Sequence, residues 1–166
     1  VIRGGCNMLG LVALPNTNPK IVAISGGFDP IHIGHIRYIH EAKKLGDCLI
    51  AILNTDEWLL NKKGFYCMPL EERFEILIAL KDVDGIVIQI DTDNTVANTL
   101  RMVKPHIFAE GGDRHENNMP QLELDACKEI NCEIVYGVGG DKISSSREFI
   151  RKLRSPLLYP HVEYIT

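Results

Sequence analysis

Two histidines three residues apart, His32 and His35, stand where an apolar run gives way to a helical pattern. Residues with this spacing at a helix start share one face of the helix. The same helix start offers backbone N–H groups and the positive end of the helix dipole to an anion. Two imidazoles beside such an N-terminus can hold a phosphate group and stabilise the charge that develops in a transition state. The spacing therefore predicts a phosphate site.

The neighbouring residues favour the same interpretation. Glycines after an apolar run let backbone N–H groups approach an anion closely, and a glycine between the histidines leaves room for a base or ribose. We expect this segment to bind nucleotide through Gly26, Gly27, Phe28, Asp29 and Gly34. Two alternatives stay open: ordinary histidines at a strand–helix turn, and a metal site, for which no third ligand is evident.

A second candidate segment carries hydroxyl groups next to an arginine, and it comprises Ile143, Ser144, Ser145, Ser146 and Arg147. Three hydroxyls and a guanidinium at a helix start can hold the β- and γ-phosphates of a triphosphate. From Lys142 to Arg154 there are five basic residues and one acidic residue, in a chain of net charge −4. That local excess suits a small polyanion. A helix cap with spare serines and a solvated basic face is the alternative.

Further polar residues follow the other apolar runs. Lys62 and Lys63 precede the predicted helix start Pro69-Leu70-Glu71-Glu72-Arg73, and we place the two lysines in a loop. Their alternative is a solvated pair of surface charges. The turn Glu110-Gly111-Gly112-Asp113-Arg114 has glycines whose backbone could hydrogen-bond the edge of a base. Asp113 could also cap a helix or help to hold Mg²⁺ indirectly.

These residues need a scaffold, and the apolar runs predict one. Five short β-branched runs are typical of strands buried on both faces: 21–24, 49–53, 86–90, 107–109 and 134–136. Helical patterns lie at 34–45, 69–80, 96–103, 122–130 and 146–153. Strands that alternate with helices predict an α/β fold, here one Rossmann-like domain with a five-stranded parallel sheet flanked by helices. Ligands of such sheets bind at the carboxyl ends of the strands.

Length and composition limit the function. The 166 residues suit one domain with a sizeable core. We expect this domain to span 20–154, between an N-terminal extension of uncertain role (1–19) and a C-terminal tail (155–166). The negative net charge argues against nucleic-acid binding, and no run is long enough to span a membrane. Five cysteines without a Cys-x-x-Cys pair indicate neither a disulfide framework nor a zinc site, which favours a reducing cytoplasm.

The string from Gly26 to His35 resembles the HxGH signature of a nucleotidyltransferase superfamily with an α/β nucleotide-binding fold. The closest likeness is to its cytidylyltransferase-like branch, which includes glycerol-3-phosphate cytidylyltransferases and heptose-phosphate nucleotidyltransferases. The serine segment is similar to the ISSTR motif of these enzymes, and the Gly-Gly-Asp turn to their GGD segment. One departure is the approach Val138-Gly139-Gly140-Asp141-Lys142, which lacks an arginine found in the glycerol-3-phosphate type. Lys142 supplies charge there but not a bidentate fork.

The resemblance implies residue roles. The catalytic set would be His32, His35, Lys62, Lys63 and Arg147. Glycine and serine segments, with Glu110, Asp113, Lys142 and Ile143, would bind the nucleotide. Asp56, Trp58 and Arg73 would lie on the acceptor side, although a partly buried aromatic on a short helix is the simpler interpretation of Trp58. Asp29 would orient neighbouring backbone or contact the acceptor.

The resemblance also implies the reaction. A phosphate oxygen of a phosphorylated alcohol or polyol would attack the α-phosphorus of CTP, and pyrophosphate would leave, with Mg²⁺ accompanying the triphosphate. One alternative is ATP with a sugar phosphate. Another, of a different class, is a nucleotide-binding regulatory module without turnover. The resemblance further implies a homodimer.

Overall fold

The computed structural model describes residues 19–112, 114–140 and 150–151, and within these ranges the chain forms a five-stranded parallel sheet. The strand order is β3-β2-β1-β4-β5. The strands span β1 Ile21–Gly26, β2 Cys48–Leu53, β3 Gly85–Ile88, β4 Ile107–Gly111 and β5 Glu133–Val138. Every pairing is parallel. The order changes direction at β1, where chain segments leave to β2 on one side and β4 on the other, and such switch points form ligand sites.

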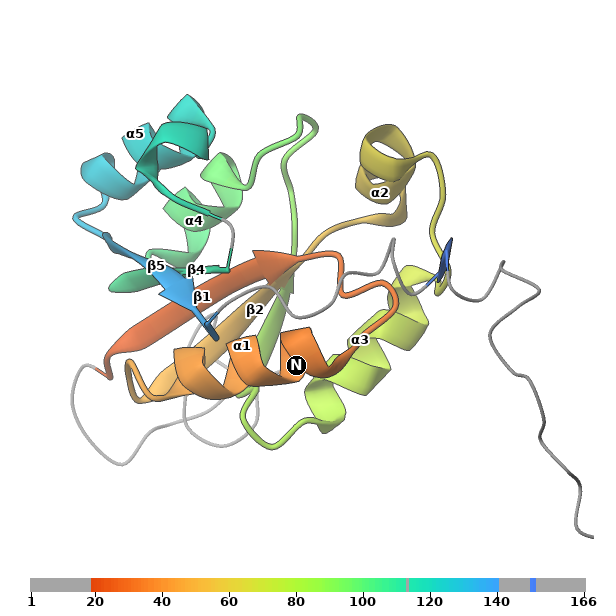
Figure 1. Cartoon of the computed structure of the whole chain (residues 1–166). Helices are drawn as coiled ribbons and strands as arrows, with labels where there is room; N and C mark the ends of the chain where they lie inside the picture. Colours follow the sequence, from red (N-terminus) through yellow and green to blue (C-terminus); the bar gives the residue numbers. More distant parts are fainter. Residues whose placement is uncertain (1–18, 113, 141–149, 152–166) are drawn as a thin grey trace, which may run out of the picture.

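Helices cover both faces of this sheet (Figure 1). The helices span α1 Ile33–Lys43, α2 Asp56–Lys63, α3 Leu70–Ala79, α4 Ala97–Val103 and α5 Gln121–Glu129, with a 3₁₀ turn at Glu116–Asn118. One buried cluster joins the sheet to α1 and α3, and another joins it to α4 and α5. Helix α2 lies beyond the carboxyl ends of the strands (Figure 1). No described helix is both long and apolar enough to cross a membrane.

The apolar runs of the sequence predict the burial of the central strands correctly, and they overestimate the burial of the edge strand β5. All six residues of β2 are buried because helices cover both its faces and strands flank both its edges. Strand β5 was expected to be buried on both faces, and this expectation is wrong. Only Val138 of β5 is buried. The strand lies at the edge of the sheet, so its apolar run has a partner on one side alone among the described residues.

The predicted elements are otherwise confirmed, with one addition. Each of the five strands overlaps its predicted run, and α1, α3, α4 and α5 lie within two residues of their predicted bounds. The addition is α2, which the sequence indicated only as a short helix around Trp58, and whose last turn contains the lysine pair that we placed in a loop. Its apolar pattern is weak because Leu59 is its only buried residue. Most of the helix expected at 146–153 falls outside the described residues.

Candidate active site

The histidine pair forms the start of α1, at the carboxyl end of β1. His32 is the N-cap residue of the helix, with extended backbone. The His32 and His35 rings are stacked, with centroids 3.8 Å apart and an angle of 20° between the planes. The prediction that the two imidazoles share one face of a helix start is therefore confirmed. Both residues are partly buried.

Backbone hydrogen bonds determine which nitrogen of each ring carries the hydrogen. The Gly34 N–H donates to Nδ1 of His32 at 3.1 Å. The His32 N–H donates to Nδ1 of His35 at 3.3 Å. A neutral imidazole whose Nδ1 accepts must carry its hydrogen on Nε2. Each histidine can therefore donate through Nε2 to an oxygen of a bound anion.

Burial keeps the His35 imidazole neutral. Desolvation first, then the nearby His32 ring and the Lys63 charge, lower the pKa of His35 from 6.5 to about 3. The His35 ring also contacts the Phe28 ring, with centroids 5.1 Å apart. At neutral pH His35 is therefore a hydrogen-bond donor rather than a fixed positive charge, and formal charge in this site has to come from other residues.

Close packing shapes the loop between β1 and α1. A Cβ on Gly27 would lie 2.5 Å from Cδ2 of Leu59, which is fully buried in α2. A Cβ on Gly26 would meet the Phe28 ring at 3.2 Å. Phe28 itself is buried and has a positive φ of 49°. The two glycines thus let the loop pass under α2, and whether their N–H groups bind nucleotide stays a prediction.

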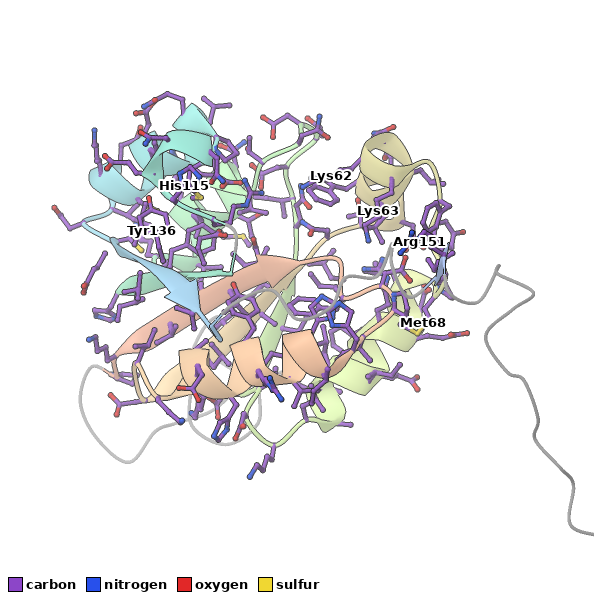
Figure 2. All side chains as sticks on the ribbon, in the orientation of Figure 1. Lys62, Lys63, Met68, His115, Tyr136 and Arg151 are labelled. Atoms are coloured by element: carbon purple, nitrogen blue, oxygen red, sulfur yellow. The ribbon has the colours of Figure 1, made fainter. Side chains whose placement is uncertain are left out.

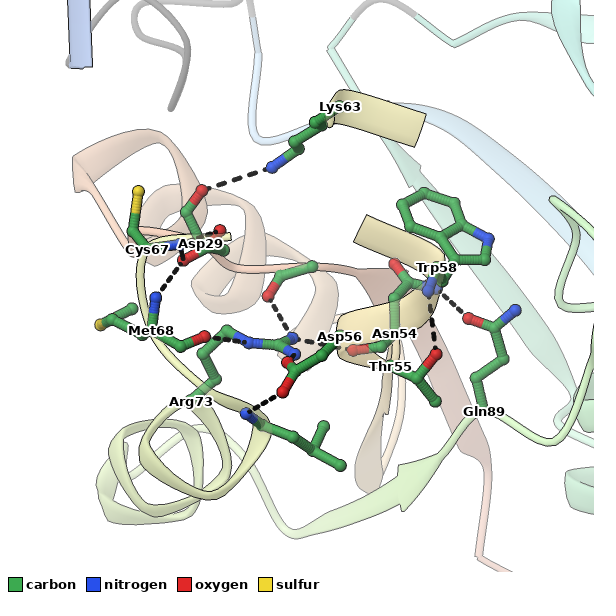
Figure 3. Close-up of polar contacts among 12 residues, drawn as sticks. Asp29, Asn54, Thr55, Asp56, Trp58, Lys63, Cys67, Met68, Arg73 and Gln89 are labelled. Atoms are coloured by element: carbon green, nitrogen blue, oxygen red, sulfur yellow. Dashed lines mark hydrogen bonds and ion pairs between the residues drawn. The ribbon is translucent and has the colours of Figure 1, made fainter. Parts of the chain in front are cut away.

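Helix α2 holds the two lysines and turns them to different sides. The Thr55 hydroxyl caps its start by accepting from the Trp58 N–H at 3.1 Å. Nζ of Lys63 donates to the backbone oxygen of Asp29 at 3.3 Å, whereas Nζ of Lys62 lies 4.1 Å from the centre of the Trp58 ring. Lys63 and Trp58 project to different sides of α2 (Figure 3). Lys63 thus reaches the loop between β1 and α1, residues 27–32, which we call the histidine loop, and Lys62 reaches the other side of α2.

Lys62 faces a mixed group of charges at the end of β4. Desolvation is the largest cause that lowers the pKa of Lys62. Arg114 also lowers it, while Glu123 and Glu110 oppose the change. The Arg114 guanidinium lies 3.8 Å from the Glu110 carboxylate. In Figure 2, the label of Lys62 marks the last turn of α2, and the label of His115 marks the turn that follows β4. Glu110 and Glu123 are buried carboxylates, and Glu123 is a neighbour that the sequence pattern did not reveal.

Asp29 is fully buried, and it holds the backbone of the connection between α2 and α3 by hydrogen bonds. Its carboxylate accepts the N–H of Cys67 at 2.9 Å and the N–H of Met68 at 2.9 Å. These contacts agree with one of its two expected tasks, the orientation of neighbouring backbone. Contact with an acceptor stays a prediction, although both carboxylate oxygens already accept from backbone.

Arg73 lies at the centre of the same network (Figure 3), and its side chain is 0% exposed. Its Nη2 pairs with Asp56 at 2.5 Å. The remaining contacts are to backbone oxygens: Nε donates to Met68 at 3.0 Å, and Nη1 donates to Gly27 at 2.9 Å and Asn54 at 2.8 Å. Asp56 and Arg73, expected on the acceptor side, are thus engaged with each other. Their contacts favour a supporting role, and acceptor binding stays a prediction.

Other buried polar groups lie next to this network. The Asn54 amide donates to Oε1 of Gln89 at 2.6 Å, and the Gln89 amide donates to the Thr95 carbonyl at 2.8 Å. Nε1 of Trp58 is buried and has no hydrogen-bond partner among the described residues. The sequence pattern did not reveal Asn54 or Gln89, because single amides at strand ends carry no spacing signal.

Part of the predicted site lies outside the described residues, namely Asp113, Lys142, Ile143, Ser144, Ser145, Ser146 and Arg147. Gly111 ends β4 and Gly112 follows it as an exposed turn residue. A hollow of about 470 Å³ lies between α1 and the end of β5, lined by Glu41, Leu45 and residues 137–140. Neither histidine lines it. Within the described ranges, no three His, Cys, Asp or Glu side chains form a group that could hold a metal.

The geometry defines a class of protein before any comparison is made. A parallel sheet places an imidazole pair, a helix N-terminus and a lysine at its switch point, and such an arrangement suits the binding of a phosphate group. A family model described as cytidylyltransferase-like matches residues 23–155. The chain belongs to this cytidylyltransferase-like family, within the nucleotidyltransferase superfamily.

Individual proteins show the same relationship. The chain is 36% identical over 124 residues to the bifunctional protein HldE of Hahella chejuensis, and the match covers 74% of this chain and 24% of that protein. It is 38% identical over 96 residues to an FAD synthase of Ferroglobus placidus, across 58% of this chain and 61% of that protein. The chain thus spans about a quarter of the length of this HldE relative.

Two solved structures share the fold. A lipopolysaccharide core biosynthesis protein from Thermoplasma volcanium matches with a TM-score of 0.61 and 30% identity, over 72% of this chain and 96% of that one. A pantoate-β-alanine ligase from Francisella tularensis matches with a TM-score of 0.56 and 20% identity, over 80% of this chain and 65% of that one. The second likeness concerns the fold alone.

Proposed function

We propose that this protein transfers a nucleoside monophosphate from a triphosphate to a phosphorylated acceptor and releases pyrophosphate. The observation that carries the proposal is the stacked pair His32 and His35 at the N-terminus of α1, with Nε2 as the donor on both rings. Family membership supports the reaction class. Two neutral donors beside a helix N-terminus suit a phosphate whose negative charge grows during transfer.

This reaction requires the protein to position the two substrates and to stabilise negative charge, and it needs no covalent nucleophile from the protein. An acceptor phosphate oxygen forms a bond to the α-phosphorus. The bond from that phosphorus to the oxygen that bridges the α- and β-phosphates breaks, and pyrophosphate leaves with the electron pair. His32 and His35 would donate to α-phosphate oxygens through Nε2. Lys63, next to the histidine loop, would supply the positive charge that neutral His35 lacks. Arg147 and Ser144 to Ser146 would hold the leaving pyrophosphate, as the sequence predicts.

Mg²⁺ would enter with the triphosphate. Magnesium usually keeps several waters and binds substrate phosphates with one or two carboxylates. When bound, the ion would offset phosphate charge, and Glu110 is the described carboxylate at the end of β4 next to the lysine side of the site.

The relatives favour ATP over our first choice, CTP. FAD contains an adenylyl group, so an FAD synthase handles an adenine nucleotide, and that relative is 38% identical. The sequence likeness to heptose-phosphate nucleotidyltransferases also points to a sugar phosphate as acceptor. We therefore propose adenylyl transfer from ATP to a sugar phosphate, and keep cytidylyl transfer from CTP to a phosphorylated polyol as the second candidate, since the family model carries the cytidylyltransferase description.

Pyrophosphate release with a panel of triphosphates and phosphorylated acceptors tests the proposal. We expect release with ATP and a sugar phosphate, and neither substrate alone should suffice. If CTP is the only triphosphate that gives pyrophosphate release, the proposal of adenylyl transfer is wrong. If the protein binds a nucleotide but no pair of substrates gives pyrophosphate, the proposal that it is an enzyme is wrong. The remaining candidate would then be a regulatory nucleotide-binding module without turnover.

A further inference from the structure

A single buried guanidinium ties together both ends of the segment that carries the lysines. We define this lysine segment as Asp56–Met68, which comprises α2 and most of the connection to α3. Nη2 of Arg73 pairs with Asp56 at the start of the segment at 2.5 Å. Nε of Arg73 donates to the carbonyl of Met68 at its end at 3.0 Å. The two ends, twelve positions apart in sequence, are thus held by one rigid fork.

The same guanidinium also holds the histidine loop. Nη1 of Arg73 donates to the carbonyl of Gly27 at 2.9 Å and to that of Asn54 at 2.8 Å. Gly27 belongs to the loop between β1 and α1, and Asn54 follows β2. Breaking one of these contacts leaves a buried charged donor without a hydrogen-bond acceptor, which is costly. The relative position of the lysine segment and the histidine loop therefore depends on Arg73.

Asp29 makes a second connection between the same two parts of the chain. Its buried carboxylate accepts the N–H groups of Cys67 and Met68, at the end of the lysine segment. Its backbone oxygen accepts from Nζ of Lys63, at the end of α2. Asp29 lies three residues before His32. Lys63 is thereby placed against the histidine loop, whereas Lys62 is placed over the Trp58 ring.

We propose that Arg73 and Asp29 are positioning residues, which lock the lysine segment to the histidine loop and make Lys63 the lysine that contacts the nucleotide phosphates. This inference rests on the proposed function for the identity of the ligand, but the lock itself is a property of the free protein. In triphosphate binding, Arg73 acts through Lys63. Lysine at position 73 would keep the charge and lose the fork that reaches both ends of the segment.

A double-mutant cycle on triphosphate binding tests the inference. We would measure the affinity of MgATP, and of MgCTP, by calorimetry without acceptor for Arg73→Lys, Lys63→Ala and the combined variant. Each single change should weaken binding about five- to tenfold, which corresponds to about 1 to 1.4 kcal/mol. The combined variant should bind no more weakly than the weaker single variant, because without Lys63 there is nothing left for Arg73 to position.

A matched control separates position from general stability. Arg101→Lys changes an arginine that pairs with Glu129 on the far side of the sheet, and it should leave binding unchanged. If the Arg73 and Lys63 effects multiply, or if Arg73→Lys binds as the wild type does, the positioning role is wrong. Should Arg73→Lys fail to fold, Asp29→Asn replaces it in the cycle, because the amide keeps one oxygen for the Cys67 and Met68 N–H groups.

Hydrogen exchange in the free protein separates failure of the inference from failure of the proposed function. Arg73→Lys and Asp29→Asn should speed exchange at the Cys67 and Met68 amides, while exchange in β2 stays unchanged. If the wild type binds neither triphosphate, the proposed function fails, and the exchange rates still decide whether the lock exists. Unchanged exchange at both amides would overturn it.

Discussion

His32 and His35 each accept a backbone N–H through Nδ1, and this detail determines what the pair can do. Both rings must donate through Nε2, and His35 is neutral at physiological pH. The residues that supply positive charge are therefore distinct from the residues that supply directed hydrogen bonds. The spacing of the histidines predicted their location, since residues three apart at a helix start are neighbours. It did not predict their protonation, which depends on burial.

Replacing His35 should remove turnover without unfolding the protein. We expect His35→Ala to lower kcat by about 10²- to 10⁴-fold, the usual contribution of one directed group at a transition state. His40→Ala is the matched control, because His40 is exposed on the same helix and pairs with Asp82 at 2.8 Å, away from the site. Steady-state pyrophosphate release measures both. A His35→Ala enzyme with nearly full activity would refute the role of this imidazole.

The depressed pKa of His35 predicts a dependence of stability on pH. In the unfolded chain the imidazole takes up a proton below its ordinary value of 6.5, whereas in the folded chain it does so only near 3. The unfolded state thus binds more protons between these values, so stability falls as the pH falls through this window, by at most about 1.4 kcal/mol per pH unit. Urea unfolding at pH 6.5 and 5 should show a smaller loss for His35→Gln than for wild type. An equal loss would contradict the assignment.

At the level of elements, α2 is the helix on which the site depends, and the sequence indicated it only as a short helix around Trp58, with the lysine pair in a loop. Its single buried side chain, Leu59, leaves no apolar periodicity to detect. The signal that was present is its start, where Thr55 caps the helix and the acidic residues Asp56 and Glu57 follow. The roles of Asp29 and Arg73 could not be predicted from local patterns, because each has a partner far away in the chain: Cys67 lies 38 residues from Asp29, and Gly27 lies 46 residues from Arg73.

The contact between α2 and the histidine loop gives a stability prediction. Gly27→Ala would bring a methyl group to 2.5 Å from Leu59, and relief by movement of that fully buried side chain is limited. We expect a loss of about 1 to 3 kcal/mol in the free energy of unfolding, measured by denaturant titration.

Two further variants check the cause of that loss. Gly111→Ala is the control, because its Cβ would meet Tyr38 at an ordinary 3.5 Å and should cost little. Leu59→Val should partly rescue Gly27→Ala, since it removes bulk at the point of overlap. Additive losses in the double variant would show that the clash with Leu59 is not the reason.

For the whole molecule, the α/β architecture and the switch-point location were predictable because alternating apolar runs and helical patterns allow few topologies. The edge position of β5 was not, since strand order depends on contacts between distant segments. The expected homodimer and the single domain of residues 20–154 stay predictions. A small polyanion rather than a nucleic acid as ligand, which the net charge of −4 favours, also stays a prediction.

Ligand binding should stabilise the whole fold. A triphosphate with Mg²⁺ at 100 times its Kd would add about 2.7 kcal/mol, which for a chain of this size raises Tm by about 5 to 10 °C. We expect this rise in wild type by differential scanning fluorimetry, and a much smaller one in Lys63→Ala at the same concentration. Inorganic phosphate is the control for nonspecific anion effects. An equal rise with phosphate alone would argue against a site built for a triphosphate.

The most direct test follows the α-phosphate itself. ATP labelled at the α-phosphorus is incubated with the protein, Mg²⁺ and a panel of sugar phosphates, and the products are separated. We expect the label to appear in the acceptor product, with one unlabelled pyrophosphate released per transfer, and transfer by His35→Ala should be slower by about 10²- to 10⁴-fold. If the α-label appears only in free AMP, nucleotidyl transfer at the histidine loop is contradicted. In a parallel reaction with ATP labelled at the γ-phosphorus, transfer of that label to the acceptor would contradict it too.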